Sequence, residues 1–316
     1  MRLQLVKPNT KIDFLSARRI AFVFSAILLA GSIIVTTVMG LNFGIDFRGG
    51  ILIEIETEEP ADIAALRNDL NGLGLGEVSL QEFGAPNDVL IRIQRQEGDE
   101  TEQMEAIEIV RGVIGEEGEG VEYRRTEFVG PTVGAELIEA GATAVILAMA
   151  AILVYIWFRF EWQFGVCAVI ALLHDIISTI GLFALIQHEF NLATVAALLT
   201  IAGYSINDTV VVFDRVRENL RRYKKATMLE ILNRSLNETL SRTIMTSVTT
   251  LLALFALYFF GGEIIRDFAF AMIWGIVIGT YSSIFIAVPM LLQVNIRKPD
   301  EKKVEESAEA KFASRG

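Results

Sequence analysis

The sequence predicts a polytopic α-helical membrane protein with six transmembrane helices and one small extracytoplasmic domain between the first and second helices. Six apolar runs each approach or exceed the ~20 residues that a helix needs to cross a bilayer. Hydrophobic residues make up 52% of the 316 residues, and the mean hydropathy is +0.45. Charge is concentrated between the first two runs, because residues 40–138 hold 22 Asp or Glu against seven Lys or Arg. Such a division is typical of a membrane unit that carries an acidic soluble domain.

The scarcity of cysteine and histidine excludes several kinds of site. Cys167 is the only cysteine, so neither a disulfide within the chain nor a cysteine-based metal site is available. His174 and His188 lie 14 residues apart and form no HExxH pair. The absence of a Gly-Lys dipeptide excludes a Walker A loop. We therefore expect no catalytic residues, no enzymatic activity, no metal and no cofactor, and the acidic domain argues against binding to nucleic acid.

The first apolar run, Ile20–Met39, follows five basic residues. A signal peptide is the alternative, but the run is long for a signal core and lacks a convincing cleavage site. We expect residues 1–40 to comprise the cytoplasmic N-terminus and a retained first span. The next stretch, Gly40–Gly50 (GLNFGIDFRGG), has the glycines of a tight, irregular exit from the membrane. By itself it suggests only a loop with one Asp–Arg pair, Asp46 and Arg48.

Residues 41–135 contain six predicted elements in the order βαββαβ, which is the ferredoxin-like arrangement. Alternation of apolar and polar residues predicts strands over Gly50–Thr57, Gly76–Phe83, Val89–Arg95 and Val121–Val129. Helical spacing predicts helices over Pro60–Asn71 and Asp99–Ile114, and Pro86–Asp88 is typical of a turn. Roughly 80 residues suffice for one small hydrophobic core. We identify no converging catalytic groups in this domain.

Residues 136–296 are predicted to form a five-helix transmembrane domain, and residues 297–316 a charged cytoplasmic tail. The small residues Gly275 and Gly279 predict a face for close helix packing. The apolar runs are about Leu137–Phe158, Phe164–Gln187, Leu192–Phe213, Ile244–Phe260 and Phe268–Val294.

The distribution of basic residues predicts the orientation. Of the 28 Lys and Arg, 20 lie in the N-terminus, at Arg159, in the loop 214–243 and after residue 296. The positive-inside rule therefore places both termini in the cytoplasm and the small domain on the outer, periplasmic side of the cytoplasmic membrane. Within the loop, residues 220–241 are expected to form an amphipathic helix on the membrane surface.

Several polar side chains lie at membrane depth, where an ionisable group is costly. Tyr204, Ser205 and Asp208 share one side of the fourth helix, and Asp208 lies ~24 Å along it, in the cytoplasmic third. The full set is His174 and Asp175 in the third span, Tyr204, Ser205, Asn207 and Asp208 in the fourth, and Arg242 and Thr246 at the inner end of the fifth.

Asp208 and Arg242 are expected at a similar depth on successive spans. This suggests either an ion pair or a carboxylate that exchanges its partner for a proton. The alternatives are a helix-packing contact for Asp208, an interfacial anchor for Arg242 and interior packing for His174 and Asp175. One charge that crosses the membrane yields ~2.3 kcal/mol per 100 mV, a usable energy source for a chain without a nucleotide site.

Five segments resemble the SecF family of protein-export membrane subunits, which belongs to the resistance–nodulation–division superfamily. They are GIDFRGG at 44–50, VGPTVGAEL at 129–137, the pair His174–Asp175, AGYSINDTVVVFDRVREN at 202–219 and SRTIMTSVTTLL at 241–252. The first contains the family-motif residues Gly44, Asp46, Gly49 and Gly50. The resemblance covers nearly the whole chain, in order and with matching spacing.

The resemblance implies a function that uses the proton-motive force to promote late steps of preprotein translocation. It also implies SecD as a heterodimeric partner, the SecYEG channel and YajC as associates, and contact with preprotein and lipid bilayer. Asp208 and Arg242 match the family's proton-pathway residues, and Asp175 matches a family-typical motif.

Three other functions are alternatives to this one. The first is half of a small-molecule or lipid exporter of the same superfamily, but exporters usually carry larger soluble domains and the GIDFRGG segment favours SecF. The second is a membrane scaffold without ion coupling. The third is an intramembrane aspartyl protease, which would need two facing carboxylates such as those of Asp175 and Asp208.

Overall fold

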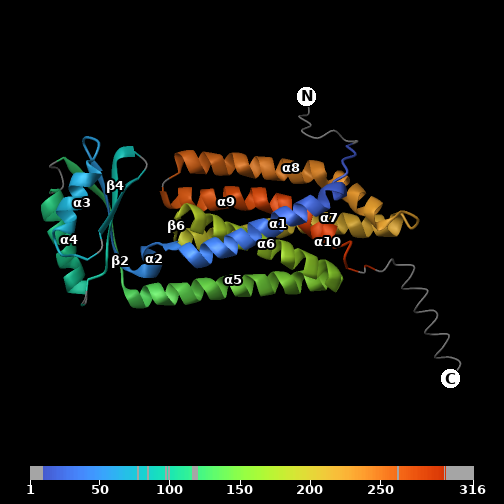
Figure 1. Ribbon diagram of the computed structural model, residues 1–316, viewed down its shortest axis with the longest axis horizontal. Coiled ribbons are helices and arrows are strands. Elements are labelled where there is room, and N and C mark those ends of the chain that lie inside the picture. Colours follow the sequence, from blue (N-terminus) through green and yellow to red (C-terminus); the bar gives the residue numbers. More distant parts are fainter. Residues whose placement is uncertain are drawn as a thin grey trace, which may run out of the picture. The chain divides into compact units, whose positions relative to one another are not determined.

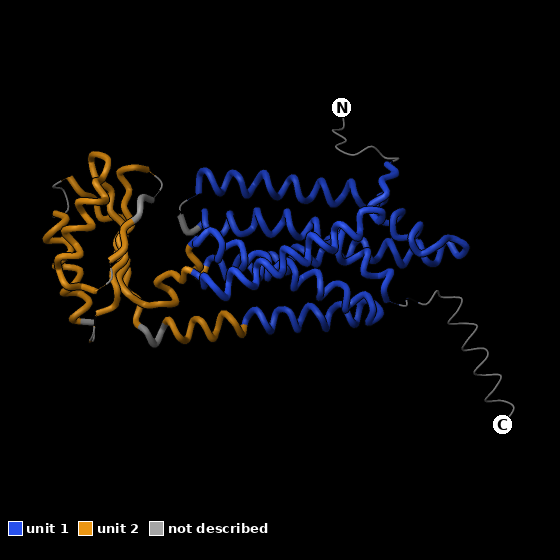
Figure 2. Tube along the Cα trace, in the orientation of Figure 1, with its two compact units in different colours: residues 1–41, 144–188, 193–316 blue, residues 42–143, 189–192 orange. Residues whose placement is uncertain are grey.

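The computed structural model describes residues 10–76, 78–83, 85–96, 98, 100–115, 120–261, 263–294 and 296 (Figure 1). The predicted charged tail, 297–316, lies outside these residues. The chain forms two compact units (Figure 2). The helical unit comprises residues 1–41, 144–188 and 193–316, and the sheet unit comprises residues 42–143 together with 189–192.

Six helices in the described residues are long and apolar enough to span a membrane, as predicted. The spanning helices run alongside one another in the helical unit (Figure 1). A short 3-10 turn, η1 (Leu15–Ala17), precedes the first helix. The elements are α1 (Arg18–Met39), α5 (Pro131–Arg159), α6 (Trp162–Ile186), α7 (Leu192–Arg222), α8 (Met228–Phe260) and α9 (Glu263–Ser282), which continues as the π-helix η2 (Ser283–Ala287) and α10 (Val288–Met290).

The predicted surface helix over residues 220–241 is wrong as a separate element. α7 continues to Arg222, and α8 begins at Met228 and runs unbroken to Phe260. Thr227 and Glu230 form a capping box that starts α8, and no Gly or Pro interrupts residues 228–260. The apolar side of this segment, including Leu232, lies in the same buried cluster as Val216 of α7 and is therefore covered by protein.

The predicted close packing of small residues on α9 is present. A Cβ at Gly275 would overlap the side chain of Ile201 on α7, and one at Gly279 would lie 3.2 Å from the Cβ of Ser205. The two glycines therefore allow α9 to approach α7 closely. This contact lies beside the buried polar cluster around Asp175.

The sheet unit contains the six predicted elements in the predicted order. The sheet has the strand order β3-β4-β2-β5, and all neighbouring strands are antiparallel. The elements are β2 (Gly50–Thr57), α3 (Ile63–Asn71), β3 (Val78–Phe83), β4 (Ala85–Ile93), α4 (Glu100–Ile114) and β5 (Val121–Val129).

Two local predictions in this unit were wrong. Pro86–Asp88 forms the start of β4 and not a turn, because Asp88 pairs with Glu56 of β2 and extends the strand. α3 begins at Ile63 and not at Pro60, because the Asp62 side chain accepts hydrogen bonds from the amides of Ala64 and Ala65 and caps the helix there.

One face of the sheet packs against α3 and α4 (Figure 1). Ile51, Ile53 and Ile55 alternate along β2 onto this face and are fully buried against Leu70 of α3 and Val110 of α4. On the opposite face, Leu52 and Leu90 form a smaller cluster with Ile45. The alternation seen in the sequence therefore fixes which face of the sheet carries the main core.

The segment expected to be an irregular exit from the membrane contains two short elements. They are β1 (Asn42–Phe43) and a single helical turn, α2 (Ile45–Arg48). Gly49 and Gly50 follow with φ values of +71° and +126°. A Cβ at Gly50 would lie 2.7 Å from the carbonyl oxygen of Ile93, so both the backbone conformation and the space require glycine.

Candidate functional site

Asp175 on α6 has a buried carboxylate, and both of its oxygens have hydrogen-bond partners. Its side chain is fully buried. One carboxylate oxygen, Oδ2, accepts hydrogen bonds from Ser205 Oγ of α7 at 2.6 Å and from Ser282 Oγ of α9 at 2.7 Å. A single acidic group therefore joins three helices in the interior of the helical unit.

His174 extends this cluster toward α1. Its Nδ1 lies 3.0 Å from Asp175 Oδ1, and its Nε2 is buried without a hydrogen-bond partner among the described residues. The ring lies 6.1 Å from that of Tyr281, whose hydroxyl donates to the Ala21 carbonyl and hydrogen bonds with Ser25 of α1. His174 therefore links the Asp175 carboxylate to Tyr281, which in turn contacts α1.

The cluster lies where α9 changes its helical geometry. Ser282 is the last residue of α9, and the π-helix η2 follows before Pro289. Proline lacks an N–H and clashes with the carbonyl four residues earlier, so the preceding turn cannot close as a regular α-helix. In η2, Ser283 hydrogen bonds with Thr209 of α7 at 2.8 Å. Irregular helical turns of this kind often occur at functional sites.

Asp208 is 3% exposed, and its Oδ2 atom has no hydrogen-bond partner among the described residues. No ion pair or hydrogen bond links Asp208 to Arg242 of α8 in the described part of the chain. Arg242 itself is exposed. The exchange of Asp208 between a cation and a proton stays a prediction.

The other predicted polar residues separate into different environments. Tyr204 donates to Thr250 Oγ1 of α8 at 3.4 Å, whereas Thr246 bonds to the carbonyl of Arg242 in its own helix. Asn207 is exposed. The structure therefore brings Ser205 to Asp175 and His174, and it does not bring Asn207 or Thr246 to them.

Sequence reasoning missed Ser282, which completes the bonding of Asp175. The signal was available, because Thr280–Ser283 (TYSS) interrupts the last apolar run with four polar residues. Ser178 and Thr179 were also missed, and both donate to the Asp175 backbone carbonyl from the next turn of α6.

No group of three or more His, Cys, Asp or Glu residues capable of holding a metal occurs in the described ranges.

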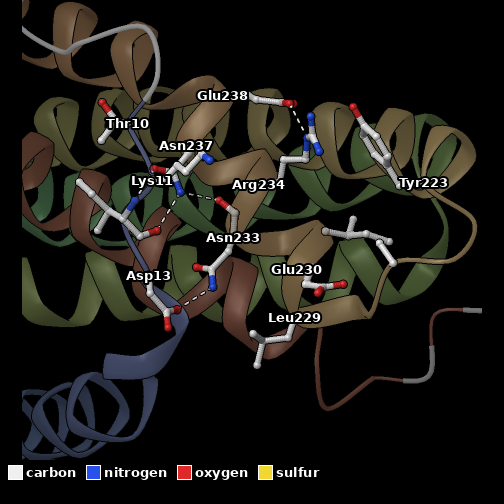
Figure 3. Close-up of a pocket in the computed structure, with 13 residues that line it drawn as sticks. Thr10, Lys11, Asp13, Tyr223, Leu229, Glu230, Asn233, Arg234, Asn237 and Glu238 are labelled. Carbon is white, nitrogen blue, oxygen red and sulfur yellow. Dashed lines mark hydrogen bonds and ion pairs between the residues drawn. The ribbon is translucent and has the colours of Figure 1, made fainter.

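A separate pocket of about 870 Å³ lies between the N-terminal segment and the start of α8 (Figure 3). The Asn237 side chain accepts a hydrogen bond from the N–H of Ile12 and donates one to its carbonyl. The Asn233 side chain donates to the Asp13 carboxylate. The pocket contains none of the predicted site residues.

Comparison with known proteins identifies the family. Residues 111–297 match the family "Protein export membrane protein SecD/SecF, C-terminal", and residues 34–61 match the "SecD/SecF GG Motif". The chain is 47% identical to the protein translocase subunit SecF of Rickettsia rickettsii, over 96% of this chain and 98% of the relative. The chain belongs to the SecF family. SecF of Cereibacter sphaeroides is also 47% identical, over 99% of this chain and 98% of its own.

Two solved structures show the same fold as this SecF-family chain. A crystal structure of SecDF from Thermus, a translocon-associated membrane protein, superposes with a TM-score of 0.80 at 35% identity over 92% of this chain. SecDF in its super-membrane-facing form gives a TM-score of 0.67 at 34% identity over 98% of this chain. This chain spans 39% and 41% of those two longer chains.

Proposed function

We propose that this SecF-family chain is an accessory subunit of the Sec translocon that couples the proton-motive force to late steps of preprotein translocation. It acts in the cytoplasmic membrane with SecD, in association with the SecYEG channel and YajC. Both termini are in the cytoplasm, and the sheet unit is on the outer side, where it meets the preprotein. The observation that carries this proposal is the Asp175 carboxylate, which is buried and bonded to two other helices.

The chemistry of the Asp175 cluster suits a protonation switch. An ionised carboxylate only accepts hydrogen bonds, whereas a protonated one must also donate. A proton on Oδ2 of Asp175 requires Ser205 or Ser282 to turn its hydroxyl or to move, whereas a proton on Oδ1 is donated toward Nδ1 of His174. Since these serines lie on α7 and α9, a change of charge at Asp175 alters the packing of three helices.

Asp208 supplies the second proton-binding group of the proposal. A buried carboxylate oxygen without a donor is costly, and either a cation or a proton would relieve that cost. Arg242 is the candidate cation, because it is a basic residue at the inner end of the next span, where the sequence predicts a depth similar to that of Asp208. In our proposal Asp208 alternates between a proton and Arg242, and each charge that moves across the membrane contributes ~2.3 kcal/mol per 100 mV.

The exposed apolar faces of two helices support a partner in the bilayer. An 18-residue apolar stretch of α5 contains no buried residue, although Ile156 of the same helix is buried. In the corresponding stretch of α1, 17% of the residues are buried. Ile146 and Leu147 of α5 are 66% and 63% exposed. We assign these faces to lipid and to SecD.

The aspartyl protease alternative receives no support from the site. Asp175 is bonded to His174 and to two serines, with no contact to the carboxylate of Asp208 in the described residues. A protease of that kind needs two carboxylates that share a proton or a water. The proposal therefore assigns no catalytic activity to the chain.

Translocation into inverted membrane vesicles tests the proposed function. Asp175→Asn keeps the size of the side chain and removes its titration. We expect this variant to assemble with SecD at the wild-type level and to lose the part of preprotein translocation that depends on the proton-motive force. Asp13→Asn, at the surface near the N-terminus, is the matched control and should behave as wild type. Full force-dependent translocation by an assembled Asp175→Asn complex would refute the proposal.

A further inference from the structure

Residues 189–192, which lead into α7, belong to the sheet unit and not to the helical unit (Figure 2). Their strand β6 (Glu189–Phe190) pairs in parallel with β1 (Asn42–Phe43). The amide of Gly44 then donates to the Phe190 carbonyl at 3.0 Å. The GIDFRGG segment, 44–50, is therefore bonded to the residues that lead directly into α7.

Asp46 provides a specific bond to that helix. Its Oδ2 atom accepts a hydrogen bond from the backbone N–H of Leu192, the first residue of α7, at 2.9 Å. The first N–H groups of a helix have no partner within the helix. Asp46 thus caps α7 from a position 146 residues away in the sequence. No hydrogen bond or ion pair joins Asp46 to Arg48 within the described ranges.

A second contact holds the same segment to the sheet. Glu189 forms an ion pair with Arg92 of β4, and the two side chains are only 19% and 18% exposed. Gly44 makes room for this pair, because a Cβ there would overlap the Glu189 carboxylate. The φ of Gly44 is −68°, so space and not backbone conformation requires glycine at this position.

The same segment also contacts the start of α5. A Cβ at Gly134 would lie 2.7 Å from the carbonyl oxygen of Phe47 in α2. Gly134 lies in the second matched segment, VGPTVGAEL, so two glycine-containing motifs meet at this point. One helical turn, α2, therefore touches the beginnings of two long helices.

We infer that the GIDFRGG segment anchors the first residue of α7 within the sheet unit, and that Asp46 is a positioning residue for that helix. α7 is a single helix of 31 residues that carries Ser205 and Asp208 farther along. Asp46 therefore acts at the first residue of the helix that holds these two polar groups. This inference rests on the proposed function only in that α7 takes part in the coupling.

Two aspartates in the same unit allow a matched test. Asp62 caps α3 through the amides of Ala64 and Ala65, but α3 does not lead into a span. Asp46→Ala and Asp62→Ala each remove one cap. Asp46→Asn retains an acceptor of nearly equal capping strength. All three variants are to be examined in the assembled complex with SecD, by hydrogen exchange of the amides and by translocation.

We expect Asp46→Ala to speed hydrogen exchange of the amides in the first turn of α7 about five- to tenfold, which is the effect of losing one cap. The variant should also lower the translocation that depends on the proton-motive force at least fivefold. Asp46→Asn should restore both values. Asp62→Ala should speed exchange in α3 only and leave translocation unchanged. Unchanged exchange at residues 192–195 in Asp46→Ala would overturn the inference, as would an equal loss of translocation in Asp62→Ala. The exchange result does not depend on proton coupling, so it separates a failure of this inference from a failure of the proposed function.

Discussion

The hydroxyl of Ser282 donates a hydrogen bond of 2.7 Å to the carboxylate of Asp175, at the point where α9 becomes a π-helix. The bond joins α6 and α9 in the interior of the helical unit, and both residues are fully buried. While Asp175 is ionised, this contact is a charge-assisted hydrogen bond, which is stronger than a bond between two neutral hydroxyls.

Ser282→Ala should therefore destabilise the purified subunit by about 1.5–3 kcal/mol, the range for a hydrogen bond to a charged group. Ser247→Ala is the matched control, because Ser247 is also buried but bonds to the neutral hydroxyl of Thr280 at 2.8 Å. This change should cost about 0.5–1.5 kcal/mol. Denaturant unfolding in detergent measures both variants. Equal losses would show that the Asp175 carboxylate adds nothing to the strength of the bond.

The packing of α9 against α7 gives a second prediction. Gly275→Ala should destabilise the subunit by about 1–3 kcal/mol, because the new methyl group would overlap Ile201. Gly203→Ala provides the comparison, since a Cβ there has nothing within 4 Å. That variant should be neutral or slightly stabilising, because alanine favours the helix by up to about 1 kcal/mol. Thermal unfolding of the isolated subunit distinguishes the two, and a neutral Gly275→Ala would contradict the packing described here.

A charge exchange tests the ion pair between Arg92 and Glu189. Arg92→Glu alone puts two carboxylates together in a partly buried place and should destabilise the sheet unit by about 2–4 kcal/mol. The double change Arg92→Glu with Glu189→Arg should recover most of that loss. Limited proteolysis of the sheet unit is the measurement.

The exposed pair Arg125 and Glu127 serves as the control for that exchange. These side chains are 31% and 39% exposed, so Arg125→Glu should cost less than about 1 kcal/mol. If the double variant Arg92→Glu with Glu189→Arg is no more stable than Arg92→Glu alone, the two charges do not stabilise the sheet unit by their interaction.

Much of the fold could be predicted from the sequence because its signals are local. Six apolar runs gave the spanning helices, and alternation along residues 50–129 gave the βαββαβ order. The burial of Asp208 followed from its place inside an apolar run. The surface helix was wrong because an amphipathic pattern does not say whether lipid or another helix covers its apolar side. Here α7 covers it.

The hydrogen-bond partners of Asp175 and Asp46 could not be predicted, because they are distant from these residues in the sequence. Ser282 lies 107 residues from Asp175, and Leu192 lies 146 residues from Asp46. Periodicity assigns a residue to a face of its own helix but does not identify the neighbour across that face. Ser205 illustrates the limit, since its expected place on the same side of the helix as Asp208 did not identify Asp175 as its partner.

The central claim is that the chain couples the proton-motive force to translocation, which requires Asp208 to carry protons. Proton flux in vesicles that hold the reconstituted complex with SecD tests this claim most directly. Asp208→Asn is compared with wild type and with Asp214→Asn, a change on the same helix that affects only an exposed pair with Arg159. We predict that Asp208→Asn abolishes force-driven proton flux in an assembled complex and that Asp214→Asn retains it. Full proton flux in the Asp208→Asn complex would contradict the claim.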